Sequence, residues 1–166
     1  MERVIPLSEK LIKGGVAGFL ATVPMTVFML TAWRKLPARE KYPLPPRLIT
    51  RRLVQEAGVE QKVDADELTW LTLTLHFLFG AATGSLYGLV EDRVELNDAL
   101  KGSLMGMAVW SGSYLGWIPA FGILPPATEH PWRRNLLMIV AHLIWGSALG
   151  RLTRMMSAQH QPYIDL

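Results

Sequence analysis

Apolar and charged residues separate into long blocks along this chain. Four segments carry no Asp, Glu, Lys or Arg: residues 14–33, 68–90, 102–128 and 135–150. A helix needs about 20 apolar residues to cross the roughly 30 Å hydrocarbon core of a bilayer. The first three segments meet that length, and the fourth does so if Arg151 extends its charged end to the interface. The pattern therefore predicts an all-α membrane protein with four transmembrane helices.

Two motifs recur in the same order in the two halves of the chain. Lys-Gly-x-x-x-Gly occurs at residues 13–18 and 101–106, and His-x-x-aromatic-Gly-x-x-x-Gly at residues 76–84 and 142–150. A Leu-Pro-Pro sequence lies between the two motifs in each half. This order predicts an internal repeat of one helix–loop–helix unit. Because a two-helix unit returns to the side where it started, the two copies are expected to be parallel.

The repeat predicts one membrane domain, residues 1–166, built from two tandem helical hairpins. Repeat A is expected at about residues 9–90 and repeat B at about 97–155, followed by a C-terminal tail, 156–166. With an even number of spans, both termini lie on one side of the membrane.

Most glycines in the chain are spaced four residues apart, which places them on one face of a helix. Between lipid-exposed helices, association depends on close packing at small residues. We therefore expect these positions to form helix–helix contacts, although a close approach to a ligand is the alternative reading. They are Gly14, Gly18, Gly80, Gly84, Gly88, Gly102, Gly106, Gly112, Gly116, Gly146 and Gly150.

Prolines mark interruptions in the helical pattern. Pro24 lies inside the first apolar segment, where it removes a backbone hydrogen bond and predicts a kink. Pro45 and Pro46 in the first loop, and Pro125 and Pro126 in the second, restrict the preceding residue to extended backbone. We expect both pairs to form turns at the membrane interface.

The first loop contains a short amphipathic helix, expected at residues 46–57, with Pro46 at its start and Gly58 after its end. Its apolar residues share one face, which predicts a helix lying on the bilayer surface. A basic face on such a helix can bind anionic lipid or a protein partner. The basic residues are Arg47, Arg51 and Arg52.

Polar residues just before two of the expected spans have the spacing of helix caps. Asp64 and Glu67 form a capping-box pattern before the second span. Asn97 or Asp98 can cap the third span.

The amino-acid composition excludes several kinds of functional site. The chain has no Cys, which excludes disulfides and thiolate nucleophiles. The four apolar segments contain no acid, Lys or Arg, which argues against an ion pump or a proton-coupled transporter. The titratable candidates within them are His76 and His142, with the weak acids Tyr87 and Tyr114. Ser111 and Ser113 lack a placed acid partner, so we expect no catalytic triad and no enzyme. The net charge of +3 fits residues flanking the spans rather than a nucleic-acid partner.

His76 and His142 occupy equivalent places in the repeat, each about seven or eight residues into its span. Two neutral imidazoles at one depth can ligate a haem iron, bind another metal or relay protons. The structural alternative is that each histidine hydrogen-bonds a neighbouring helix or contacts a substrate.

Three functions are therefore compatible with the sequence. The first is a non-enzymatic accessory or structural subunit that binds lipid or a protein partner through the basic surface helix, with homo-oligomers possible through small-residue faces. The second is a small-solute transporter or channel between the two hairpins. The third is a haem b or metal protein that uses His76 and His142.

Short motifs spread over most of the chain resemble those of the YagU-like family of bacterial inner-membrane proteins. They lie at residues 43–47, around His76, at 102–106, at 122–126 and at 142–145. The chain lacks a longer insert that the family has after the first proline motif. The resemblance implies an inner-membrane location, a link to acid tolerance and termini in the cytoplasm, and it carries no catalytic residues.

The distribution of basic residues favours the opposite orientation in the membrane, with the termini outside. The side with the termini holds seven Lys and Arg and the other side holds ten. Because Lys and Arg are more frequent in cytoplasmic loops, the simple count favours termini outside. Several of the ten belong to the surface helix, so we follow the resemblance.

Overall fold

The computed structural model describes residues 6–93 and 95–158, and the regular elements in those ranges are helical. The longest are α1 (Leu7–Arg34), α3 (Ala65–Val90) and α6 (Trp132–Ala158). Three segments are long and apolar enough to cross a membrane: Leu7–Arg34, Ala65–Arg93 and Trp132–Ser157. The prediction of an all-α protein with membrane-spanning helices is confirmed in this form.

The remaining expected span, residues 102–128, differs from one regular helix. Helix α4 (Asp98–Ser111) continues as a π-helix, η4 (Gly112–Trp117), and a short helix, α5 (Ile118–Ala120). Within η4, Gly116 leaves helical geometry, with φ −112° and ψ −108°. Glycines and a proline are poor residues for an α-helix interior, and this stretch contains two glycines followed by Pro119.

Short elements connect these helices. Helix α2 (Pro45–Glu56) begins and ends one residue earlier than predicted, with the two prolines in its first turn. Gly58 follows it with a φ of 66°, a conformation that favours glycine. The 3₁₀ turns are η1 (Ala38–Glu40), η2 (Glu60–Lys62), η3 (Glu91–Arg93) and η5 (Ala127–Glu129).

Both predicted caps are present. The Asp64 carboxylate accepts hydrogen bonds from the backbone N–H groups of Asp66 and Glu67, each at 2.8 Å. The Glu67 carboxylate accepts one from the Asp64 N–H at 2.9 Å, which completes the capping box. Asn97 caps α4 by accepting from the N–H of Ala99 at 3.0 Å.

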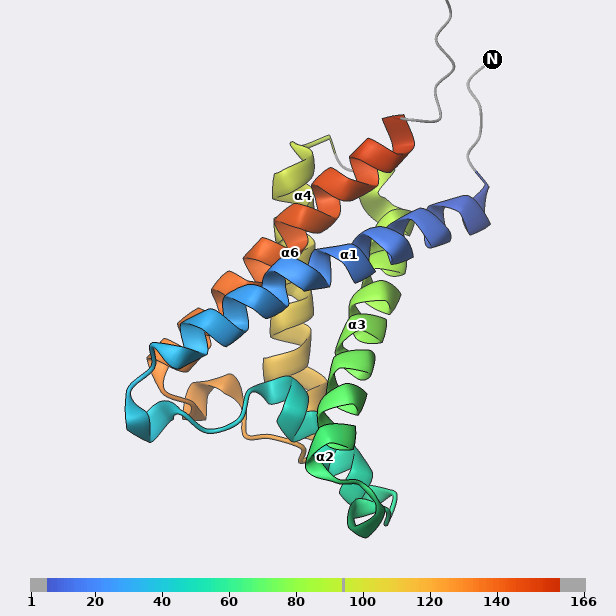
Figure 1. Ribbon diagram of the computed structural model, residues 1–166. Helices are drawn as coiled ribbons and strands as arrows, with labels where there is room; N and C mark the ends of the chain where they lie inside the picture. The colour runs from blue at the N-terminus through green and yellow to red at the C-terminus, as the bar shows by residue number, and fades with distance from the viewer. Residues whose placement is uncertain (1–5, 94, 159–166) are drawn as a thin grey trace, which may run out of the picture.

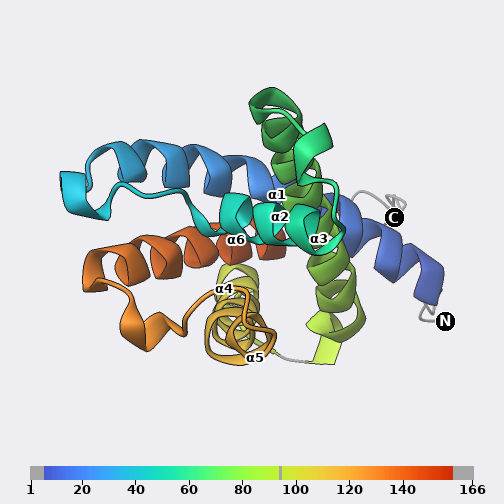
Figure 2. The ribbon, with the colours of Figure 1, turned by 90° about the horizontal axis from the view of Figure 1, so that it is seen from below.

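The four principal helices are arranged as two packed pairs. Helix α1 packs on α3, α4 packs on α6, and α1 joins the pairs by packing on α6. Figure 1 shows α1 and α6 running side by side in opposite directions, with α4 behind α6 and the later part of α3 crossing behind α1. Seen from below, α2 lies between the two pairs at the end of the molecule that holds the loops (Figure 2).

Glycines lie in both helix pairs where the backbones approach most closely. A Cβ atom added at Gly84 of α3 would lie 2.7 Å from Cα of Gly18 in α1. One added at Gly102 of α4 would lie 2.8 Å from the amide nitrogen of Gly150 in α6. Real Cβ atoms do not approach so closely, so side chains are excluded here. The other glycines in these two contacts are Gly14, Gly80, Gly88, Gly106 and Gly146.

Gly112 and Gly116 do not follow the prediction of helix packing. A Cβ atom added at either would have nothing within 4 Å among the described residues. The reason is the π-helical turn: Gly112 begins η4 and Gly116 breaks its geometry. Their outward face is exposed.

Pro24 lies within α1, which remains one continuous helix from Leu7 to Arg34. The missing N–H would have bonded to the carbonyl of Leu20. Neighbouring threonines donate elsewhere: Thr22 to the Gly18 carbonyl at 2.8 Å and Thr26 to the Thr22 carbonyl at 2.7 Å.

A buried arginine fixes the first loop against the start of α6. The Arg134 guanidinium donates hydrogen bonds to the carbonyls of Glu40 at 2.8 Å and of Tyr42 and Pro43 at 2.9 Å. It also lies 3.6 Å from the centre of the Tyr42 ring, a cation–π distance. The Glu40 carboxylate is buried and pairs with Arg133 at 3.3 Å. The two hairpins are therefore joined at their loop ends.

Charged residues make contacts within and between the hairpins at the opposite end. Within the first hairpin, Lys10 in α1 pairs with Asp92 after α3. Lys101 in α4 donates to the backbone carbonyl of Glu91 at 3.3 Å and pairs with Asp98 at 3.1 Å. The space between the hairpins is thus bounded by polar contacts at both ends.

Candidate functional site

A cavity of about 240 Å³ lies between the two hairpins. Residues from α1, α2, α3, α6 and the α4–α5 segment all contribute to its wall. Of the described residues in that wall, none is Asp, Glu, Lys or Arg. The lining includes Thr22, Met25, Ile49, Thr50, Leu53, His76, Phe79, Thr83, Val109, Ser113, Tyr114, Trp117, Ile118, Met138, His142 and Trp145.

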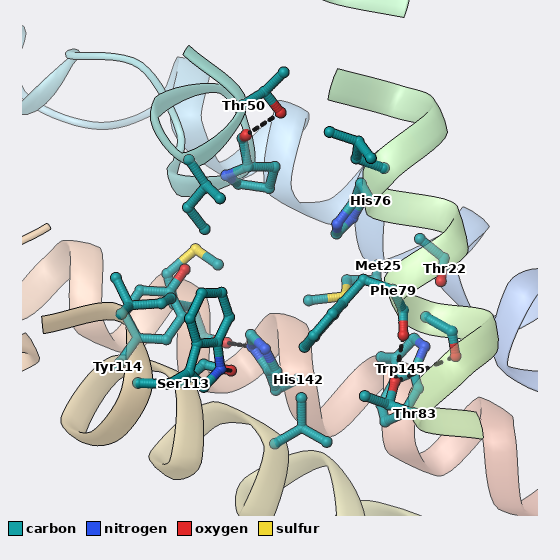
Figure 3. Close-up of a pocket in the computed structure, with 18 of the residues that line it drawn as sticks. Thr22, Met25, Thr50, His76, Phe79, Thr83, Ser113, Tyr114, His142 and Trp145 are labelled. Carbon is teal, nitrogen blue, oxygen red and sulfur yellow. Dashed lines mark hydrogen bonds between the residues drawn. The ribbon is translucent and has the colours of Figure 1, made fainter. Parts of the chain in front are cut away.

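The structure places both predicted histidines in this one cavity. His76 reaches it from α3 and His142 from α6, so each hairpin supplies one imidazole. Figure 3 shows the two rings on different sides of the space, with Met25 and Phe79 beside them.

His76 has an unsatisfied polar atom. Its Nε2 is buried and has no hydrogen-bond partner among the described residues. A buried polar group without a partner costs roughly 1–3 kcal/mol. Because a native site rarely leaves such an atom unpaired, His76 is a candidate ligand-binding residue.

His142 is held in a fixed orientation by its own helix. Its Nδ1 lies 2.7 Å from the carbonyl oxygen of Met138, one turn earlier in α6. A carbonyl only accepts, so Nδ1 carries the hydrogen. The edge of the ring also contacts Tyr114, with centroids 6.1 Å apart and planes at 86°.

The two histidines are not at equivalent places in the helix contacts. The added Cβ atom at Gly18 would meet the carbonyl of Gly80, whereas that at the matching Gly106 would meet the carbonyl of His142. Packing therefore matches His142 with Gly80, although the motifs match it with His76. The difference is four residues, or one helical turn of about 5.4 Å.

The remaining polar side-chain groups in the wall are hydroxyls and two indoles. Thr22 donates to its own helix, and Ser113 accepts a hydrogen bond from the Trp117 indole at 3.2 Å. The Trp145 indole donates to the Gly18 carbonyl at 3.1 Å and so connects α6 to α1. These bonds leave the hydrogen of the Ser113 hydroxyl free to donate.

Aromatic rings from the two hairpins meet beside the cavity. Phe79 of α3 and Trp117 of η4 have ring centroids 6.2 Å apart. Both side chains are partly exposed, 41% and 36% respectively. They stand between the cavity and the outer surface of the protein, where α3 and α4 are in little contact.

Helix α2 closes the cavity at the loop end, which differs from the predicted surface helix. Ile49, Thr50 and Leu53 on its apolar face line the cavity. The helix also packs on α3. Apolar surface is removed from water in either arrangement, so the amphipathic pattern alone does not choose between lipid and the protein interior.

The predicted basic face points away from the cavity. Arg47 donates to the hydroxyl of Thr69 at 2.7 Å, and Arg52 pairs with Glu56 at 2.6 Å. Arg51 is exposed. Arg47 and Arg51 line a second depression between α2 and the start of α3.

The predicted proline turns lie at the loop end. Pro45 and Pro46 form the first turn of α2, and Pro126 precedes η5 after Pro125. The predicted C-terminal tail, 156–166, lies outside the described residues from position 159 onward. Among the described residues, no group of three or more His, Cys, Asp and Glu is placed to hold a metal ion.

A family model described as "protein of unknown function (DUF1440)" matches residues 30–150, which contain most of the cavity wall. The chain belongs to the DUF1440 family. No curated protein and no solved structure matches it. The DUF1440 match establishes the family, and the resemblance to YagU-like proteins stays a prediction.

The sequence singled out His76 and His142 but missed most of the other lining residues. Met25, Thr83, Tyr114 and Met138 have no motif that distinguishes them from ordinary residues of apolar spans. They share a wall only because α1 packs on α6 and separates α3 from α4.

Proposed function

We propose that this DUF1440 protein is an integral membrane protein whose cavity between the hairpins binds a small, uncharged and mainly apolar molecule. The observation that carries the proposal is the cavity wall, which is apolar except for two imidazoles, a few hydroxyls and two indoles. A charged ligand without a charged partner would lose its hydration at a high cost.

The size of the cavity limits the ligand. About 240 Å³ is larger than the roughly 150 Å³ engineered cavity that admits benzene. It is smaller than the roughly 300–1,000 Å³ of sites for drug-sized ligands. The cavity therefore fits one ring or a short branched segment, and any long chain on the ligand must extend outside it.

The route to the cavity is through the bilayer. Phe79 and Trp117 form the contact between the hairpins on the outer side, and both are partly exposed. We infer that the segment from α4 through α5 crosses the membrane as a fourth, irregular span. Its three parts are 14, 6 and 3 residues long and together approach the length needed for the hydrocarbon core.

Native mass spectrometry of the protein, extracted gently from its own membrane, tests this function. We expect the wild-type chain to carry a small molecule of defined mass. Thr83→Phe places a ring in the cavity and should remove that mass. Thr31→Phe, the same change at an exposed position of α1, should retain it.

Two results would contradict the proposal. One is the bare chain mass in the wild-type protein and both variants. The other is an adduct that survives Thr83→Phe unchanged, which would locate binding outside the cavity.

A further inference from the structure

Two imidazoles from opposite hairpins line the cavity. His76 belongs to α3, and His142 belongs to α6. Most of the surrounding wall is apolar or aromatic. A ligand that satisfies both imidazoles must therefore bear two polar groups on a small apolar body.

The hydrogen bond to Met138 defines what His142 can recognise. Nδ1 donates its hydrogen to that carbonyl at 2.7 Å. In a neutral imidazole with Nδ1 protonated, Nε2 has a lone pair and no hydrogen. His142 can therefore only accept a hydrogen bond from the ligand, and a carbonyl or ether oxygen cannot pair with it.

His76 restricts the hydrogen-bonding group of the ligand less than His142 does. Its buried Nε2 lacks a partner among the described residues, and it is a donor or an acceptor according to the tautomer. A hydroxyl group donates and accepts, so it satisfies His76 in either tautomer. A hydroxyl group is thus a simple uncharged substituent that pairs with either histidine.

We propose that the cavity selects an alkylated hydroquinone: a single ring with two hydroxyl groups and a chain that extends into the bilayer. One hydroxyl donates to Nε2 of His142, and the other pairs with Nε2 of His76. The alkyl chain of the ligand leaves the cavity between Phe79 and Trp117, whose partly exposed rings meet on the outer side of the protein. This inference rests on the proposed function, because it names the ligand class of the same cavity.

The aromatic residues support a ring as the apolar body. Tyr114, Trp117 and Trp145 lie in the wall together with Phe79. Aromatic rings favour stacked or edge-on contacts with another ring, worth about 0.5–1.5 kcal/mol beyond the area that they bury.

Titration with a matched pair of ligands tests the inference. Decylhydroquinone and its dimethyl ether have the same ring and chain, but the ether lacks both donors. Binding to the full chain in nanodiscs is followed by quenching of tryptophan fluorescence. Two hydrogen bonds of about 0.5–1.5 kcal/mol each predict that the hydroquinone binds about tenfold more tightly or better.

The variant His142→Phe removes one of the two hydrogen bonds and should clearly reduce this preference while the ether still binds, which shows that the cavity is intact. His130→Phe changes the histidine that contacts Tyr42 outside the cavity and should keep the preference. If His142→Phe does not fold, the ¹⁵N resonance of Nε2 in wild-type His142 replaces it. That resonance should move with the hydroquinone and not with the ether.

The outcomes separate the inference from the proposed function. Equal affinity of the wild-type protein for the two ligands, or a preference that is undiminished in His142→Phe, would overturn the hydroquinone inference and leave an apolar binding site. Failure of both ligands to bind would overturn the proposed function as well.

Discussion

Single glycines determine how closely the helices of each pair approach. At Gly84 and Gly102 the facing backbone occupies the place that a side chain would need. Membrane helices gain little from water exclusion, so such contacts carry much of the association energy.

We expect Gly84→Ala to lower the thermal midpoint of the purified protein. The added Cβ would lie 2.7 Å from Cα of Gly18, so α1 and α3 must separate. Overpacking of this kind costs about 1–3 kcal/mol. Gly112→Ala is the matched control, because nothing lies within 4 Å and alanine favours helix. A midpoint unchanged in Gly84→Ala would contradict the close packing.

Arg134 is the most connected polar side chain between the loops. It is only 5% exposed and donates three hydrogen bonds to the first loop. Loss of the guanidinium removes the donor to the Glu40 and Pro43 carbonyls, whereas the Tyr42 carbonyl still accepts from the Trp33 indole at 3.0 Å.

Arg134→Ala should therefore destabilise the protein by about 2–4 kcal/mol. At about 2–4 °C per kcal/mol, the thermal midpoint would fall by roughly 5–10 °C. Arg133→Ala, which removes one partly exposed ion pair with Glu40, should cost about 1 kcal/mol or less. Equal effects of the two changes would show that the three backbone contacts of Arg134 contribute little.

At the scale of elements, the sequence predicts best where the signal is local. Three spans follow from charge-free apolar runs, and the caps at Asp64 and Asn97 follow from side chains that bond to the next turn of their own helix. These features need no knowledge of the rest of the chain.

Other elements depend on tertiary packing and were not predictable in the same way. The apolar face of α2 indicates burial but not whether lipid or protein covers it, and the structure places Ile49 and Thr50 in the cavity wall. The motif match between His76 and His142 does not show the one-turn shift, because the shift arises from how α6 meets α4. The π-helix has a more local origin, because it lies where Gly112, Gly116 and Pro119 weaken the α-helix that the apolar run predicts.

The contact between α1 and α6 joins the hairpins, and Trp145 is its largest buried side chain with a bond to the other hairpin. Trp145→Ala should cost about 3–5 kcal/mol because it leaves a void and removes the indole donor. Trp145→Phe should cost about 1 kcal/mol for the hydrogen bond alone, since Thr22 still donates to the Gly18 carbonyl. Thermal unfolding measures both.

Trp70→Ala is the control for these changes, because that side chain is 71% exposed. If Trp70→Ala lowered the stability as much as Trp145→Ala does, the α1–α6 contact would not be what holds the hairpins together.

For the whole molecule, the path of the chain through the membrane is the main structural prediction. The chain has no Cys, so single cysteines can be introduced without a background. Four crossings place Ser8→Cys and Glu95→Cys on one side, and Glu60→Cys and Glu129→Cys on the other. An impermeant thiol reagent applied to sealed vesicles distinguishes the sides.

Glu129→Cys decides the number of crossings. If the α4–α5 segment returned without crossing, residue 129 would be labelled from the same side as residue 95. That result would leave three spans and would contradict a cavity enclosed by four membrane helices.

The proposed function depends on a small molecule reaching the cavity from the bilayer. The most direct measurement uses a photoreactive alkyl diazirine dissolved in liposomes that contain the protein, with labelled residues identified by mass spectrometry. We predict labelling of Met138, which is 5% exposed, and of the buried Met25 and Ile118, with loss of that labelling in Thr83→Phe. Labelling confined to outward residues such as Leu136, which is 50% exposed, would contradict the claim that the cavity binds membrane-soluble molecules.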